Sequence, residues 1–311
     1  MNNGNHEKSG EMESINKTLL RLCERPAGTP RESQMKQEKQ FEECQCESCG
    51  NKFQGEVTVY MLGGRPREHR PWECPSCKEK REAEEEKERQ EYLVKARREE
   101  RELWRQRSGI PEGLINRTFD NFEPGWQDKA LKVCRKYAEG FKVEEAKGYR
   151  SLILYSPSPG VGKTHLMVAI ANFIIANWNG EPGQIFRPIR FESGPGLVRR
   201  IRATYNLRRD DVEHEREEDI YHELRGVKLL MLDDVGKENP SNFTRELYWY
   251  IINERVASGL PVVMTCRLPL EGKQSLKELM TEDTVDRLYG MAHGHVEILQ
   301  GESYRTLKKV A

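Results

Sequence analysis

The stretch Ser151–His165, SLILYSPSPGVGKTH, decides the fold of this 311-residue chain. It begins with SLILYS, a short apolar run typical of a buried strand, passes through a Gly/Pro loop and ends at GKTH. The following residues, HLMVAIANFIIANW (165–178), predict an apolar helix. A strand, a glycine-rich loop and a helix in this order are typical of a P-loop, where backbone N–H groups and the positive end of the helix surround a phosphate.

The P-loop predicts a role for each of its residues. Lys163 is expected to reach the β- and γ-phosphates of a nucleoside triphosphate, and the Thr164 hydroxyl to hold Mg²⁺. Pro157 stands where the full pattern has glycine, so the entrance of the loop is expected to differ. His165 also fits a packed helix residue. The residues expected to bind the nucleotide are Gly160, Val161, Gly162, Lys163, Thr164 and His165.

A second apolar run, VKLLMLDD (227–234), predicts a buried strand that ends in two acids. In P-loop enzymes the first acid after such a strand holds Mg²⁺ and the next orients the attacking water. We therefore assign Asp233 to the metal side and Asp234 to water positioning, and count both with Lys163 as catalytic candidates.

Apolar strands alternate with helical patterns through the rest of the chain. Further strands are expected at 189–191, 260–266 and 295–299, and helices at 127–141, 196–206 and 242–258. Continuous apolar strands separated by helices predict an α/β fold, a parallel sheet sandwiched by helices.

The N-terminal third has a different composition. Two CxxC pairs predict a small zinc ribbon with a structural Zn²⁺ held by Cys46, Cys49, Cys74 and Cys77. Cys44 is an alternative to Cys46. A redox CxxC would need a thioredoxin-like βαβ pattern, which is missing. The charged run Lys78–Arg107 contains neither Gly nor Pro and predicts an exposed helix.

These patterns divide the chain into four parts: a disordered tail at 1–40, the zinc ribbon at 41–80, a charged helical connector at 81–108 and an ATPase domain at 109–311. The 51 Lys and Arg balance the 51 Asp and Glu, which gives no argument for a general nucleic-acid coat. The chain shows neither an N-terminal hydrophobic signal nor an apolar run long enough for a membrane span. We expect a cytoplasmic protein without a membrane partner.

The motifs GIPEGLINRTFDNF, PGVGKTHL, LLMLDDVG, VDRL and GESYR occur in this order between Gly109 and Arg305. In this respect the chain resembles the AAA+ ATPases of the bacterial helicase-loader type (DnaC/DnaI-like), with the transposition helper IstB as a near relative. The resemblance implies ATP and Mg²⁺ as cofactors. It implies that Arg287 in VDRL is an arginine finger acting on a neighbouring subunit, hence head-to-tail oligomers, and that Arg305 in GESYR contacts the nucleotide.

One position departs from the family. The strand before VDRL commonly ends Thr-Ser-Asn, whereas this chain has Thr265, Cys266 and Arg267. A cation therefore replaces the amide that orients the attacking water. Either Arg267 contacts the γ-phosphate directly or hydrolysis is slow.

The resemblance also implies partners, namely a hexameric replicative helicase and single-stranded DNA. The segment Gly196–Asp211 is arginine-rich and contains Tyr205, so it fits either a DNA-binding insertion or a solvated helix face. Phe119 and Phe122 could wall the adenine or simply pack. The arginines of the segment Gly196–Asp211 are Arg199, Arg200, Arg202, Arg208 and Arg209.

Three functions remain open from the sequence. The first is a helicase loader that oligomerises with ATP and is released by hydrolysis. The second is a helper that recruits a transposase to duplex DNA. The third is a nucleotide-gated interaction protein with little hydrolysis. The zinc ribbon and the long connector favour the loader.

Overall fold

The computed structural model describes residues 38–62, 65–123, 125–205 and 215–307. The chain divides into two compact units, Met1–Glu86 and Lys87–Ala311. Most of the predicted disordered tail, residues 1–37, lies outside the described residues. Within the described parts, no helix is both long and apolar enough to cross a membrane.

The first unit contains a three-stranded antiparallel sheet in the order β1-β2-β3, formed by β1 (Glu38–Gln45), β2 (Lys52–Leu62) and β3 (Arg65–His69). Between the two CxxC pairs, the sequence GEVTVYMLGGRP (55–66) predicts one hairpin, which corresponds to β2 and β3. The third strand, β1, has the sequence EKQFEECQ, whose apolar residues are too few to indicate a strand. Pairing along the whole length of β1 with β2 supplies the backbone hydrogen bonds that its side chains do not predict.

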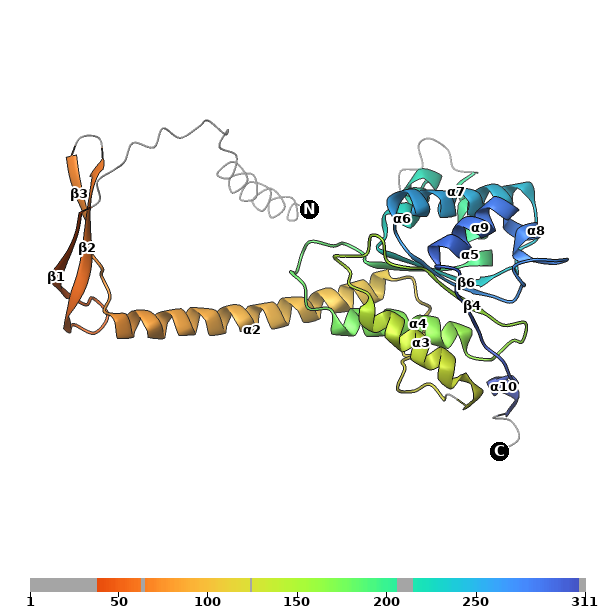
Figure 1. Cartoon of the computed structure of the whole chain (residues 1–311), viewed down its shortest axis with the longest axis horizontal. Helices are drawn as coiled ribbons and strands as arrows, with labels where there is room; N and C mark the ends of the chain where they lie inside the picture. The colour runs from red at the N-terminus through yellow and green to blue at the C-terminus, as the bar shows by residue number, and fades with distance from the viewer. Residues whose placement is uncertain (1–37, 63–64, 124, 206–214, 308–311) are drawn as a thin grey trace, which may run out of the picture. The chain divides into compact units, whose positions relative to one another are not determined.

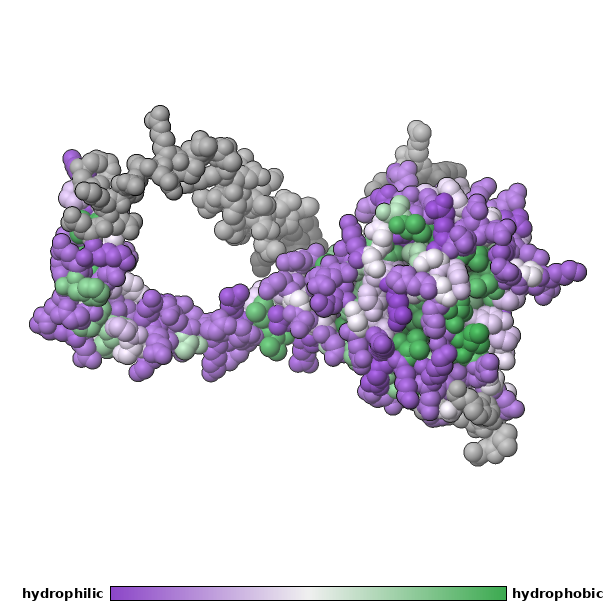
Figure 2. Space-filling view, viewed as in Figure 1, coloured by the Kyte–Doolittle hydropathy of each residue, from purple (hydrophilic) through white to green (hydrophobic). Residues whose placement is uncertain are grey.

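The charged helix is α2 (Pro75–Arg107), and the division between the two units falls within it. Its residues are good helix formers with interleaved charges, and Figure 2 shows hydrophilic side chains over most of it. Trp104 is its one buried residue among those described. The Trp104 ring lies 4.3 Å from that of Trp178, and its Nε1–H donates to the Ile185 carbonyl oxygen at 2.9 Å. This residue therefore anchors the end of α2 within the second unit.

The second unit is built on a five-stranded sheet in the order β5-β6-β7-β4-β8. Its strands are β4 (Leu152–Tyr155), β5 (Ile189–Ser193), β6 (Leu229–Val235), β7 (Val262–Cys266) and β8 (Val296–Ile298). Every neighbouring pair is parallel. Because the strands are parallel, the P-loop after β4 and the two acids near the end of β6 lie at the same edge of the sheet.

Helices cover both faces of this sheet, which confirms the predicted fold class (Figure 1). On one face lie α3 (Asp128–Gly140) and α4 (Lys163–Asn177); on the other lie α5 (Gly194–Thr204), α6 (Glu217–Gly226), α7 (Asn242–Ser258), α8 (Leu276–Met280) and α9 (Glu282–Met291). Each face has its own apolar core. The short helices η1 (Gly125–Gln127) and α10 (Tyr304–Leu307) complete the unit.

A buried arginine joins α7 to the sheet. Arg255 is 0% exposed, and its guanidinium donates to the carbonyl oxygens of Leu224 at 3.0 Å and Val227 at 2.6 Å, as well as to those of Lys228 and Pro261. Burial lowers its pKa to about 9. The Arg255 side chain thus donates hydrogen bonds to backbone carbonyls at the end of α6 and just before β7.

Arg255→Ala is expected to reduce the free energy of unfolding by about 3 to 5 kcal/mol, because several buried carbonyls lose their donor together. Arg225→Ala is the matched control, since Arg225 is exposed and forms only a surface pair with Glu254 at 3.6 Å. It should change stability by less than about 0.5 kcal/mol. Urea unfolding of both variants measures the difference, and equal midpoints would contradict this role of Arg255.

Candidate phosphate-binding site

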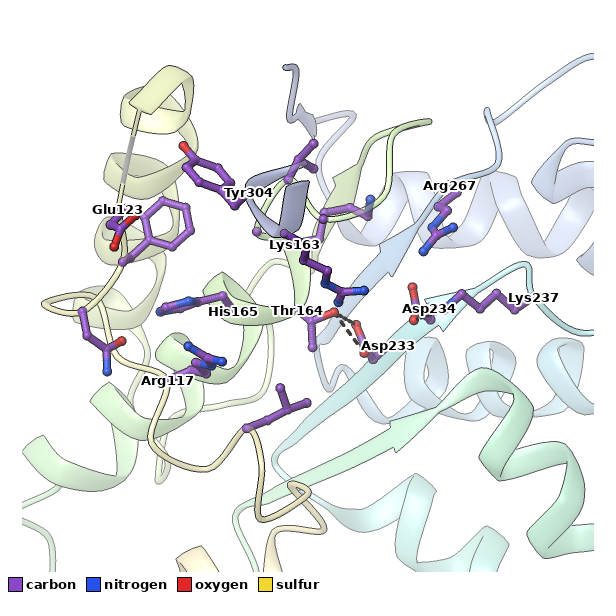
Figure 3. Close-up of a pocket in the computed structure, with 17 residues that line it drawn as sticks. Arg117, Glu123, Lys163, Thr164, His165, Asp233, Asp234, Lys237, Arg267 and Tyr304 are labelled. Atoms are coloured by element: carbon purple, nitrogen blue, oxygen red, sulfur yellow. Dashed lines mark hydrogen bonds and ion pairs between the residues drawn. The ribbon is translucent and has the colours of Figure 1, made fainter. Parts of the chain in front are cut away.

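A cavity of about 560 Å³ lies at the carboxyl ends of β4, β6 and β7 (Figure 3). Its walls come from five places in the sequence: the P-loop, the end of β6 with the loop after it, Arg267 after β7, the segment 114–123 and the start of α10. Of the residues predicted for the nucleotide and Mg²⁺, all but Arg287 line it. They are Gly160, Val161, Gly162, Lys163, Thr164, His165, Asp233, Asp234 and Arg305.

Two glycines of the loop are required by both conformation and packing. Gly160 has φ +72° and Gly162 has φ +99°, values that L side chains rarely adopt. A Cβ on Gly162 would lie 2.7 Å from Cε2 of Phe122, and one on Gly160 would collide with the Ser303 hydroxyl. The segments containing Phe122 and Ser303 therefore close on the loop from two directions.

Lys163 is a buried cation in this cavity. Its Nζ donates to the carbonyl oxygens of Ser156 at 3.1 Å and Ser158 at 3.0 Å, both neutral acceptors. Burial, and next the positive charge of Arg267, lower the pKa of Lys163 to about 8. Two cations in one cavity favour a ligand with several negative charges.

Thr164 and Asp233, the two residues predicted to hold Mg²⁺, lie in direct contact. The Thr164 hydroxyl donates to Asp233 Oδ1 at 2.8 Å (Figure 3). The Thr265 hydroxyl donates to the same oxygen at 2.7 Å. Burial raises the pKa of Asp233, and these two hydrogen bonds oppose that shift. A hydroxyl and a carboxylate oxygen at adjacent positions fit Mg²⁺, which prefers hard oxygen ligands.

Asp234 has a strained backbone and a charged neighbour. Its φ is +53°, and its N–H donates to the Thr265 hydroxyl at 2.9 Å. Its carboxylate pairs with Lys237, which also lines the cavity. Sequence reasoning missed both Lys237 and Thr265. The i, i+3 spacing from Asp234 was the available signal for Lys237, whereas Thr265 is brought to the acids only by the pairing of β6 with β7.

The three arginines singled out from the sequence occupy different positions. Arg267 lines the cavity, and its buried Nε has no hydrogen-bond partner among the described residues. Arg305 lines the cavity from α10 and is exposed. Arg287 is exposed on α9 and does not line the cavity, whereas its neighbours Val285 and Leu288 pack into the core.

The aromatic residues before the core divide between packing and lining. Phe122 lines the cavity and lies edge-to-face with His165, with 5.0 Å between ring centroids. His165 Nε2 lies 2.9 Å from the Thr118 carbonyl oxygen, and burial lowers the pKa of the imidazole. Phe119 packs against Phe173 instead. His165 is thus a packed part of the wall, and Phe122, not Phe119, belongs to the lining of the cavity.

The four predicted zinc ligands form one cluster in the first unit. The Sγ atoms of Cys46, Cys49, Cys74 and Cys77 lie within 4.8 Å of one another. The Cys49 and Cys74 sulfurs are 3.8 Å apart, the separation of about 3.8 Å that a tetrahedron with Zn–S bonds of about 2.3 Å requires. The Ser76 hydroxyl lowers the pKa of Cys74 to about 6, which favours the thiolate that a metal binds. The cluster therefore fits a tetrahedral metal ion.

The other cysteines lie apart from this cluster. Cys44 is buried against Gly55 and is not a member. Cys134 and Cys266 are free, buried thiols, and burial raises the pKa of each. Cys23 lies outside the described residues.

The arginine-rich segment is only partly open to a ligand. Arg200 is bound by the carboxylates of Glu192, Glu215 and Glu223, so its charge serves the packing of α5 and α6. Arg199 and Arg202 are exposed, as is Tyr205. Arg208 and Arg209 lie outside the described residues.

Comparison with known proteins places this geometry in a family. The family model of IstB-like ATP binding proteins matches residues 88–311. The replicative helicase loader DnaC of Buchnera aphidicola subsp. Acyrthosiphon pisum is 30% identical over 184 residues, which cover 58% of this chain and 67% of that protein. DnaC of Escherichia coli K12 is 27% identical over 204 residues, 64% of this chain and 74% of that protein. A crystal structure of the DnaC helicase loader is 25% identical with a TM-score of 0.47, covering 61% of this chain and all of that one.

Proposed function

Because the chain belongs to the family of IstB-like ATP binding proteins, we propose that it binds ATP with Mg²⁺ in this cavity and loads a replicative helicase onto single-stranded DNA. The similarity to two DnaC helicase loaders through the ATP-binding unit carries the proposal. ATP binding drives head-to-tail oligomerisation, and hydrolysis releases the protein from the loaded helicase.

The residues of the cavity divide the work of ATP hydrolysis. Lys163 and the N–H groups of the P-loop hold the β- and γ-phosphates, while Phe122 packs against the base. Thr164 and Asp233 would hold Mg²⁺, which would neutralise negative charge on the phosphates. Asp234 positions the attacking water once the ATP complex draws Lys237 away from it.

Arg267 acts on the terminal phosphate of its own subunit. We expect Arg267→Asn, which introduces the family's amide, to reduce turnover at saturating ATP about a hundredfold, since a cation no longer meets the transition-state charge. ATP binding should change less than about threefold. Phosphate release and titration with a nonhydrolysable analogue separate the two effects. A rise in turnover would instead mean that Arg267 slows hydrolysis.

Arg287 acts on the terminal phosphate bound by a neighbouring subunit, as a second cation beside Arg267. It is exposed and does not line the phosphate site of its own subunit. Arg287→Ala should leave ATP binding unchanged and reduce turnover at least about a hundredfold. Mixing this variant with Lys163→Ala should restore part of the activity, because one variant has an intact cavity and the other an intact finger. Mixtures as inactive as the separate variants would contradict action between subunits.

The first unit would contact the helicase through its zinc ribbon. We assign Zn²⁺ to Cys46, Cys49, Cys74 and Cys77, whose geometry fits a closed structural site. Phe41 and Trp72 are 72% and 47% exposed on this small unit, and exposed aromatic side chains are typical of docking surfaces. Single-stranded DNA would meet Arg199, Arg202 and Tyr205 of the second unit.

The test of this proposal is direct binding to the replicative helicase of the same organism. We expect the full-length protein with zinc and ATP to form a defined complex with the helicase hexamer, detected as a single mass by mass photometry. A transposase encoded beside the gene serves as the competing partner. Binding to the transposase and not to the helicase would favour the transposition helper.

A further inference from the structure

A second cavity, of about 740 Å³, lies in the unit Lys87–Ala311 and shares no lining residue with the phosphate site. It is bounded by the C-terminal half of α2, the segment 116–120, Arg135 of α3 and the second half of α4. Its volume is in the range of ligand pockets, and the function proposed above uses none of its residues.

Three arginines of one helix face line this cavity without a carboxylate partner. Arg98, Arg101 and Arg105 are spaced i, i+3 and i+7 on α2, and none of them forms an ion pair with a described residue. Arg101 Nε donates to the Trp178 carbonyl oxygen at 3.0 Å. Arg105 Nη2 donates to the Ile115 carbonyl oxygen at 3.1 Å and to Asn116 Oδ1 at 2.6 Å.

These bonds go to neutral acceptors, so they fix the guanidinium groups without neutralising them. Each guanidinium has five N–H donors, of which these contacts use only some. The two acids of the lining offset only part of the charge. Asp120 pairs with Arg135 at 3.3 Å, and Glu102, which accepts a bond from the neutral Gln106 at 3.2 Å, is one carboxylate beside three arginines. A prearranged cluster of positive charge therefore faces the cavity.

The wall formed by α4 is largely apolar. It contains Ala169, Phe173, Ile175 and Ala176, together with the amides Asn172 and Asn177. Phe119 is 5% exposed, with Arg135 over its ring at 5.2 Å and the Phe173 ring edge-on at 5.8 Å. The Phe119 ring is therefore not open to a stacked base, as a site for single-stranded nucleic acid would require. A ligand with separate carboxylates joined by apolar groups fits this cavity, because the carboxylates can pair with the arginines of α2 and the apolar groups can pack against α4.

We propose that this cavity binds an acidic segment of a partner protein. Asp or Glu side chains of the segment pair with Arg98, Arg101 and Arg105, which are separated by about 4.5 and 6 Å along the helix axis, and aliphatic side chains pack against Phe173 and Ala176. The site is independent of ATP, since none of the nucleotide-binding residues lines it.

The experiment uses a displayed library of random peptides, selected on the full-length protein and counter-selected on the double variant Arg101→Gln, Arg105→Gln. We expect the enriched peptides to be rich in Asp and Glu with interspersed aliphatic residues. In fluorescence anisotropy, each arginine-to-glutamine change should weaken binding of the best peptide by about tenfold. Arg98→Gln is included because Arg98 makes no described hydrogen bond, so its loss cannot act through the fold.

Two controls separate this site from the rest of the molecule. Arg89→Gln removes the same charge from an exposed position of α2 outside the cavity and should leave the affinity unchanged. Lys163→Ala should also retain peptide binding, so a failure of the proposed ATP site does not affect this test. Arg105→Glu should abolish binding, and a peptide with Lys in place of the paired acid should restore it.

Several results would overturn the proposal. They are a selection that enriches no peptide dependent on Arg101 and Arg105, an enrichment of basic peptides, or equal affinity of the Arg89→Gln and Arg98→Gln variants. Binding of an oligo-dT strand that needs these same arginines, with no dependent peptide, would assign the cavity to nucleic acid instead.

Discussion

Lys163→Ala is expected to weaken binding of ATP by at least about a hundredfold, the largest effect that one side chain of the phosphate site can have. The ammonium is buried in the loop and held by two neutral carbonyl oxygens. Bonds between this cation and two phosphates are charge-assisted, and each contributes about 1.5 to 3 kcal/mol. Calorimetric titration with ATP and Mg²⁺ measures the loss.

Lys132→Ala is the control for this prediction. Lys132 is exposed on α3 and does not line the cavity, so its removal changes the net charge by the same amount. Its ATP affinity should equal that of the unmodified protein. If Lys163→Ala keeps tight ATP binding while remaining folded in thermal unfolding, the nucleotide is bound elsewhere.

Removal of zinc is expected to unfold the ribbon and leave ATP binding intact. The three strands bury few apolar side chains, so the metal supplies much of the folding energy of this unit. Every residue that lines the phosphate site belongs to the other unit. Chelation should therefore expose the region 38–74 to rapid amide exchange, measured by mass spectrometry, while the ATP affinity stays the same.

Single substitutions separate the metal ligands from other cysteines. Cys49→Ser should lower zinc affinity at least about a hundredfold, because a tetrahedral site loses one of its four thiolates. Cys44→Ser should retain one zinc per chain, since Cys44 is not in the cluster. Zinc retained by Cys49→Ser and lost from Cys44→Ser would contradict the ligand assignment.

The parallel sheet could be predicted because its central strands β4, β6 and β7 contain continuous apolar runs. LILY and LLMLDDV are buried on both faces of the sheet. A short apolar run of this kind, flanked by helical patterns, is typical of a strand in a parallel sheet. Strand β1 could not be predicted in this way, because a polar edge strand depends on pairing with β2 rather than on its own side chains.

In the candidate site, too, residues that are contiguous in sequence could be predicted, whereas residues brought together only by the fold could not. The P-loop and the acid pair were visible because each is contiguous in the sequence. Thr265 was not, since its contact with Asp233 requires β7 to lie beside β6. The sequence left Arg200 open between a DNA contact and a solvated helix face, because Glu192, Glu215 and Glu223, which bind it, are separated from it in sequence. Charge patterns alone do not distinguish a free cation from a paired one.

The most direct test of the central claim is a loading assay on single-stranded DNA coated with single-stranded-DNA-binding protein. The replicative helicase of the same organism is supplied as a closed hexamer, and unwinding of an annealed fork reports its loading. We predict that the full-length protein with ATP and zinc stimulates unwinding at least about tenfold, and that Lys163→Ala and Cys49→Ser do not. Unwinding that is the same with and without the protein, under conditions where it binds ATP, would contradict the loader function.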